Sequence, residues 1–192
     1  MKSIKYKELY DSSFLDKFGS KKTEIESLEL NEESGYAIDV EEIASINSIT
    51  INPDYLFEDS GSYDSEKKII NVNSLEPEYR QRFTIAHELG HAISGHDGMS
   101  YRTQALDKYT DIIERSKEVS ANQFAAELLM PKKLLIRLIM DIINNEGWNE
   151  KNLDSSQINS LIKQLAIKIN VSEISLKYRI KNLRLFVSAA NE

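Results

Sequence analysis

The feature that most constrains this chain is the run His-Glu-Leu-Gly-His at residues 87–91. Pro77, between Glu76 and Glu78, suits the beginning of a helix. Proline lacks the N–H that the first turn leaves unpaired, and acidic residues favour the positive end of the helix. No proline interrupts residues 78–96. We therefore expect a single helix to carry the whole run, which the fold must accommodate with both histidines on one face.

On such a helix, His87 and His91 are four positions apart and their Cβ atoms lie roughly 5–6 Å from each other. Two imidazoles on consecutive turns can bind one metal ion. Glu88 lies one step round the helix, where it can polarise a metal-bound water but is poorly placed to bind the ion. This arrangement is typical of zinc metalloproteases. All three histidines of the chain, including His96, fall within ten residues, which argues against a chance match on a solvated helix.

The run His87–His91 does not identify the third metal ligand. His96 is one candidate, but the metzincin pattern H-E-x-x-H-x-x-G-x-x-H requires Gly at position 94 and His at position 97. Ser94 and Asp97 stand there instead. We therefore expect His96 at the rim of the site and look for the third ligand elsewhere in the chain.

A second helix, expected from Asp111 to about Met130, offers acidic candidates. Its apolar stripe also carries Asp111, Glu114 and Glu118 on a helical wheel; the apolar members are Ala121, Ala125, Leu128 and Leu129. A carboxylate on a core-facing stripe costs free energy unless it meets a cation or a metal. Two histidines, one such carboxylate and a water complete a tetrahedral catalytic site. The wheel does not choose among the three acids, although Asp111 also suits the positive end of the helix.

The rest of the chain predicts a mainly helical α+β fold with a small antiparallel sheet. Asp39 can cap a short helix that ends near Ile46. Residues 48–52 alternate with period two and predict a strand, residues 61–64 predict a turn, and residues 67–73 predict a second strand. Residues 99–110 are expected to form a loop over the site.

Three regions follow from this pattern: an N-terminal extension at 1–35, a metallopeptidase domain at 36–147 and a C-terminal helical segment at 148–192. The extension is rich in Lys and Glu, and we expect it to pack on the core or on a partner. The C-terminal segment has the rhythm of a helix-turn-helix, with Ser172 as an N-cap.

Residues 158–185 carry a strong excess of positive charge. Glu173 is the only acidic residue among them, against Lys163, Lys168, Lys177, Arg179, Lys181 and Arg184. We expect this segment to dock on a partner protein. Direct DNA contact and a simple three-helix cap with solvated lysines are the alternatives.

Net charge, cysteine content and the lengths of apolar runs limit the classes of protein to which the chain can belong. The 192 residues carry a net charge of −7, which disfavours a generic nucleic-acid coat, and contain no Cys, which excludes a disulfide framework and a thiol nucleophile. The first ten residues lack the apolar region of a signal peptide, and no run approaches the length of a membrane span. We expect a cytoplasmic protein without membrane contact.

Two stretches resemble the ImmA/IrrE metallopeptidases. Residues 80–91 read R-Q-R-F-T-I-A-H-E-L-G-H and follow the family pattern R-F-T-x-A-H-E-x-G-H. Residues 118–131 read E-V-S-A-N-Q-F-A-A-E-L-L-M-P and follow E-x-x-A-N-x-F-A-A-x-L-L-M-P. Residues 61–73 also match the family's G-x-Y-D-x-x-x-x-I-I-x-[IV]-N. The resemblance covers roughly residues 36–135.

This resemblance implies specific roles. It makes Glu118 the third metal ligand beside His87 and His91, and Glu88 the general base. Ser120 stands where many members have a second Glu, which leaves Glu114 as the alternative ligand. The implied metal is Zn²⁺, with Mn²⁺ as the alternative because a His₂Glu site suits both. Independently of the resemblance, His96, Tyr101 and Tyr109 are candidates for stabilising the oxyanion by their position in the sequence alone.

The resemblance also implies a gluzincin-like fold and an intracellular role. Members are similar to bacterial endopeptidases that cleave a helix-turn-helix transcriptional repressor, often one encoded on a prophage or mobile element, and so relieve repression. The alternative is a regulatory protein that binds a repressor or DNA through its C-terminal helices without cutting.

Overall fold

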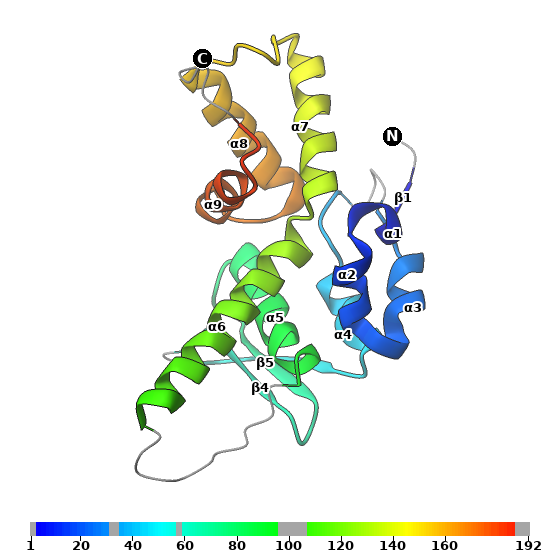
Figure 1. The fold of residues 1–192 in the computed structure, drawn as a ribbon, viewed down its shortest axis with the longest axis vertical. Coiled ribbons are helices and arrows are strands. Elements are labelled where there is room, and N and C mark those ends of the chain that lie inside the picture. Colours follow the sequence, from blue (N-terminus) through cyan, green and yellow to red (C-terminus); the bar gives the residue numbers. More distant parts are fainter. Residues whose placement is uncertain (1–2, 31–34, 57–58, 96–106, 187–192) are drawn as a thin grey trace.

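The computed structural model describes residues 3–30, 35–56, 59–95 and 107–186, and describes side chains in the last range from residue 114 onward. The predicted mainly helical α+β fold is confirmed (Figure 1). In chain order the elements are β1 (Ile4–Lys5), α1 (Tyr6–Leu9), α2 (Ser12–Leu15), the 3₁₀ helix η1 (Asp16–Lys21), α3 (Lys22–Ser27), β2 (Glu29–Leu30), α4 (Val40–Ile46), β3 (Thr50–Asp54), β4 (Gly61–Asp64), β5 (Ile69–Asn73), α5 (Glu78–Ile93), α6 (Asp107–Leu129), α7 (Lys132–Glu146), α8 (Ser155–Ile169) and α9 (Glu173–Leu183).

The main sheet differs from the antiparallel sheet expected from the sequence. Its strand order is β3-β5-β4, and β3 runs parallel to β5, with Ile51 opposite Ile70. The predicted turn at residues 61–64 is the edge strand β4, which pairs antiparallel with β5. The turn follows it instead, where Asp64 Oδ1 accepts hydrogen bonds from the backbone N–H groups of Glu66 (3.1 Å) and Lys67 (3.0 Å). The hairpin partner of β5 is therefore β4, which leaves β3 parallel on the other side.

Helix α5 packs against the sheet on one side and α6 on the other. A Cβ atom at Gly61 of β4 would collide with the Thr84 side chain of α5. On the other side, a Cβ at Gly90 would lie 3.1 Å from Ala121 Cα of α6, closer than side chains usually approach. The two small residues thus let α5 lie close to both of its neighbours.

The N-terminal segment forms part of the same hydrophobic core. Phe14 stacks on Tyr10 and on Phe124 of α6, with ring centroids 4.9 and 5.2 Å apart. Tyr10 is buried, and its hydroxyl donates a 2.6 Å hydrogen bond to the Leu128 carbonyl. Leu128 lies in the last turn of α6, whose carbonyls have no partner within their own helix. The segment therefore packs on the core, which is one of the two roles expected for it from the sequence.

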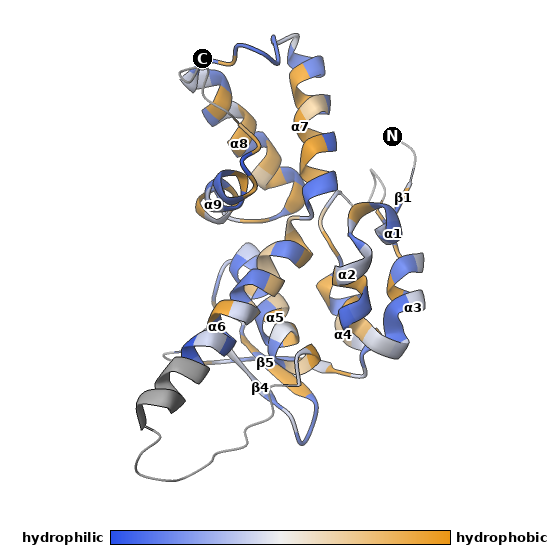
Figure 2. Cartoon of the chain, in the orientation of Figure 1, coloured by the Kyte–Doolittle hydropathy of each residue, from blue (hydrophilic) through white to orange (hydrophobic). Residues whose placement is uncertain are grey.

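The three C-terminal helices agree with the sequence. α7 follows Pro131 and ends at Gly147, and α7 and α8 pack through apolar faces that Figure 2 shows in orange. Ser172 Oγ caps α9 by accepting a hydrogen bond from the Ser175 N–H at 3.0 Å, which confirms the predicted cap. Several contacts join these helices to the core: Arg179 Nε donates to the Met130 carbonyl (3.1 Å), Asn170 Nδ2 donates to Glu78 Oε1 (2.7 Å), and Lys133 Nζ pairs with Asp11 Oδ1 (2.9 Å).

Among the described helices, none has both the length and the apolar character needed to cross a bilayer.

Replacement of Tyr10 by Phe should lower the free energy of unfolding by about 1–3 kcal/mol, because the buried Leu128 carbonyl loses its donor. Burial raises the pKa of Tyr10 well above its ordinary value, so the hydroxyl remains a donor over the whole working pH range. Urea unfolding followed by circular dichroism measures the change. Tyr55→Phe, at an exposed position, is the matched control and should leave stability unchanged. Equal stability of both variants would contradict this role of the hydroxyl.

Candidate metal centre

The predicted metal-binding residues come together at the crossing of α5 and α6. His87 and His91 lie on consecutive turns of α5, and their Nε2 atoms are 3.1 Å apart. Glu118 of α6 lies beside both: its Oε2 is 3.2 Å from His87 Nε2, and its Oε1 is 3.2 Å from His91 Nε2. In the described part of the chain, this is the one group of three or more acidic or histidine residues with ligand atoms within 4.8 Å of one another.

These separations fit a tetrahedral ion. With zinc–nitrogen and zinc–oxygen bonds of about 2.0–2.2 Å, neighbouring ligand atoms of a tetrahedron lie roughly 3.3–3.5 Å apart. The distances of 3.1–3.2 Å among His87, His91 and Glu118 are only slightly shorter. Two imidazoles and one carboxylate are also the donor set of one class of catalytic zinc site, in which the fourth position is left for water. The residues present therefore fit a bound Zn²⁺.

Glu118 is more exposed than the argument from the helical wheel implies. Its side chain is 57% exposed, whereas those of His87 and His91 are 16% and 19% exposed. The core-facing stripe of α6 begins at Ala121, which is buried. Val119, two residues before it, is exposed. Glu118 is thus not a buried charge in need of compensation. Its proximity to the two histidines, rather than desolvation, marks it as a candidate ligand.

The other candidates fall outside this group. Glu114 is exposed and does not belong to it. His96 and Tyr101 lie outside the described residues, as do the side chains of Tyr109 and Asp111. The expected loop at residues 99–110 is likewise described only from 107, where α6 has already begun.

Glu88 is half-buried beside the three clustered residues and is not one of them. Burial raises the pKa of Glu88 above its ordinary value, while the neighbouring His87 lowers it; the charge of Glu118 adds to the increase, and a backbone hydrogen bond from Tyr63 opposes it. A carboxylate with a raised pKa is a stronger base, and a base acts best when its pKa lies near the operating pH. The position therefore suits proton transfer rather than metal binding.

Sequence reasoning missed the contribution of β4. The backbone of Tyr63 reaches Glu88 because β4 lies against α5 as an edge strand rather than forming a turn. A signal was present in the sequence: Asp64 followed by Ser65 and Glu66 suits a turn after residue 64, which would have left residues 61–64 extended.

Glu118→Gln should weaken zinc binding by more than about 100-fold, since loss of groups that only support ligands already costs about 10–100-fold. Competition with a chromogenic chelator measures the dissociation constant. The matched control is Glu114→Gln, on the same helix and outside the cluster, which should bind zinc like the unmodified chain. The reverse result would make Glu114 the ligand. Added zinc should raise the melting temperature of the control but not of Glu118→Gln at the same concentration.

Comparisons with known proteins identify the family of the chain. Residues 48–181 match the family model described as the IrrE N-terminal-like domain. Over 81 residues, the chain is 41% identical to the radiation response metalloprotease IrrE of Deinococcus deserti and 37% identical to that of Deinococcus radiodurans. Each match covers 41% of this chain but only 28% and 24% of the relatives, so the chain matches about a quarter of their length. The family match spans most of the chain and includes the clustered residues on α5 and α6. The chain therefore belongs to the ImmA/IrrE family of metallopeptidases.

Proposed function

We propose that this chain is a zinc-dependent endopeptidase in which His87, His91 and Glu118 hold the ion and Glu88 is the general base. The observation that carries the proposal is the combination of a ligand cluster with a carboxylate that is next to it and outside it. A purely structural metal site has no use for such a base. Mn²⁺ is the alternative ion, because the same donor set accepts it.

Each protein group has a defined task in this reaction. Bound zinc would supply Lewis-acid polarisation of the peptide carbonyl and would lower the pKa of a water in the fourth position. Glu88 takes a proton from the attacking water and then returns it to the leaving amine. The half-buried position of Glu88 limits competing solvation of its carboxylate.

The position of β4 at the edge of the sheet favours a polypeptide as the substrate. One side of β4 pairs with β5, and in the described part of the chain no strand pairs with its other side. A peptide in extended form can add to such an edge through main-chain hydrogen bonds. Tyr63 of β4 already makes a backbone hydrogen bond to Glu88, so a peptide that pairs with the rest of this edge would pass close to the base.

We further propose a substrate class from the family resemblance: a helix-turn-helix transcriptional repressor, of a prophage or mobile element, whose cleavage in the cytoplasm relieves repression. In this scheme residues 36–147 are the catalytic unit, supported by the packing of residues 1–35. Residues 148–192 contribute contacts to the repressor.

The alternative function is binding to the repressor or to DNA without cutting. The basic character of α8 and α9 favours a binding role. Two of these basic residues, however, contact the protein itself. Arg179 donates to the Met130 carbonyl, and Lys168 Nζ lies 6.0 Å from the Tyr36 ring centroid. This weakens the case for a continuous DNA-binding face and favours docking to a protein.

The test is incubation of the purified chain with the repressor encoded next to its gene, with and without added zinc. Glu88→Gln should retain zinc but cleave at least about 100-fold more slowly, because the general base is lost. Glu114→Gln, an exposed acidic residue outside the cluster, is the control and should cleave at the normal rate. Fragments are followed by gel electrophoresis and mass spectrometry.

The outcomes separate the two functions. Metal-dependent fragments from the unmodified chain, with none from Glu88→Gln, support the endopeptidase. If the repressor stays intact and co-purifies with both the unmodified chain and Glu88→Gln, the binding function is supported and the endopeptidase is rejected. Loss of zinc from Glu88→Gln would contradict the role given to Glu88.

A further inference from the structure

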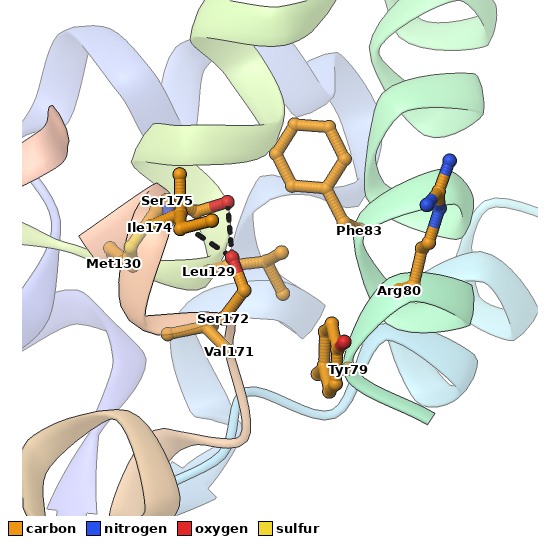
Figure 3. A pocket seen from close by; sticks show the side chains of 9 residues that line it. All are labelled: Tyr79, Arg80, Phe83, Leu129, Met130, Val171, Ser172, Ile174 and Ser175. Carbon is orange, nitrogen blue, oxygen red and sulfur yellow. Dashed lines mark hydrogen bonds between the residues drawn. The ribbon is translucent and has the colours of Figure 1, made fainter. Parts of the chain in front are cut away.

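A continuous groove runs between the catalytic helices and the C-terminal helices. Three adjoining cavities form it, of about 310, 620 and 420 Å³. The first lies between α5 and the beginning of α9, where Tyr79 and Phe83 stand across from Ser172 and Ile174 (Figure 3). It shares Tyr79 and Ile174 with the second cavity and Phe83 with the third. We call this continuous surface the α5–α9 groove.

The groove exposes an unusual concentration of apolar side chains. Ile167 is 72% exposed and Ile174 is 69% exposed, and both border the second cavity. Tyr178 and Val119 border the third, and Tyr79 lies where the first two meet. Exposed apolar side chains that gather over one concave surface, rather than lying scattered, mark an interaction site.

The groove leads to the candidate metal centre. Phe83 lies one turn before His87 on α5. On α6, Val119 follows Glu118 directly, and Asn122 lies one turn further along. A chain bound in the groove can therefore continue to the metal centre without a long connection.

The charges along the groove favour an acidic occupant. Arg80, Lys163 and Arg179 border it, against Glu173 alone, although the whole chain has a net charge of −7. Arg80 pairs with Glu76 at 3.0 Å. Neither Lys163 nor Arg179 has a carboxylate of the described residues within ion-pair distance, and they border different cavities. Lys163 can therefore receive a carboxylate from a bound molecule. Arg179 adds positive charge to the groove, although its Nε already donates to the Met130 carbonyl and Glu127 partly offsets its charge.

We propose that the α5–α9 groove binds an amphipathic segment of the protein substrate, remote from the bond that is cut. Its apolar side chains fill the cavities around Ile174 and Tyr178, and its acidic residues face Lys163 and Arg179. This inference rests on the proposed endopeptidase function, because the occupant is the substrate that reaches the metal centre. The groove would supply selectivity that the short edge strand β4 cannot.

The test measures binding apart from cleavage. The full chain carrying Glu88→Gln is titrated into a fluorescein-labelled synthetic peptide with Leu at helical spacing and Glu at the remaining positions. A second peptide has Lys in place of every Glu. Fluorescence anisotropy should show binding of the acidic peptide at least about tenfold tighter than that of the basic peptide, with the difference decreasing as salt is added.

Groove variants locate the binding. Ile174→Asp and Tyr178→Ala should each weaken binding of the acidic peptide by about tenfold or more, since both side chains are exposed and can change without unfolding the core. Leu75→Asp is the matched control: Leu75 is an exposed apolar residue between β5 and α5 that borders none of the three cavities. It should bind like the parent chain. Circular dichroism checks that all three are folded.

Several results would overturn the proposal. They are absence of binding, equal binding of both peptides, and equal binding by all variants. Two others are displacement of the peptide by duplex DNA, and a dimer of the chain that Ile174→Asp dissociates in sedimentation experiments. The repressor assay stays independent: loss of cleavage with intact peptide binding would reject the endopeptidase and retain an acidic docking segment. Cleavage without peptide binding would reject the groove alone.

Discussion

The close approach of α5 and α6 is the constraint on which the candidate site depends. Gly90 has no side chain where α5 faces α6, and a Cβ there would lie 3.1 Å from Ala121 Cα. This packing brings Glu118, a residue far along the chain, to within 3.2 Å of both histidine nitrogens. A bulkier residue at Gly90 would push the helices apart and separate the ligands, because interior packing leaves little space to absorb it. The absence of a side chain at Gly90 is thus one condition for the geometry of the cluster.

The outer parts of the chain hold α6 at its C-terminal end. Tyr10 of the N-terminal segment binds the Leu128 carbonyl, and Arg179 of α9 binds the Met130 carbonyl. These carbonyls lie where Pro131 prevents α6 from continuing. The helix is therefore anchored at the end remote from Glu118, and its remaining length projects past α5. The N-terminal and C-terminal segments support the site without contributing a residue to the cluster.

Local rules recovered much of this structure from the sequence. The helix that bears His87 and His91, and the cap at Ser172, depend on neighbouring residues and were predicted correctly. The direction of β3 could not be predicted in this way, because strand pairing depends on contacts distant in sequence. For Glu118, the wheel identified the correct side of α6 on an argument of burial that its exposure contradicts, and the family resemblance was needed to choose it. The α5–α9 groove is lined by residues from four helices, so it could not be predicted from any single stretch of the sequence.

The unequal exposure of the three clustered residues has a thermodynamic consequence. His87 and His91 belong to a helix packed on both sides, whereas Glu118 is exposed and lies one turn before Ala121, the first buried residue among the described side chains of α6. An ion bound by all three would cross-link the two helices and restrict the projecting turns of α6. By linkage, whatever loosens those turns lowers metal affinity, and whatever orders them raises it. Metal content would then report on the conformation of α6 as well as on catalytic competence.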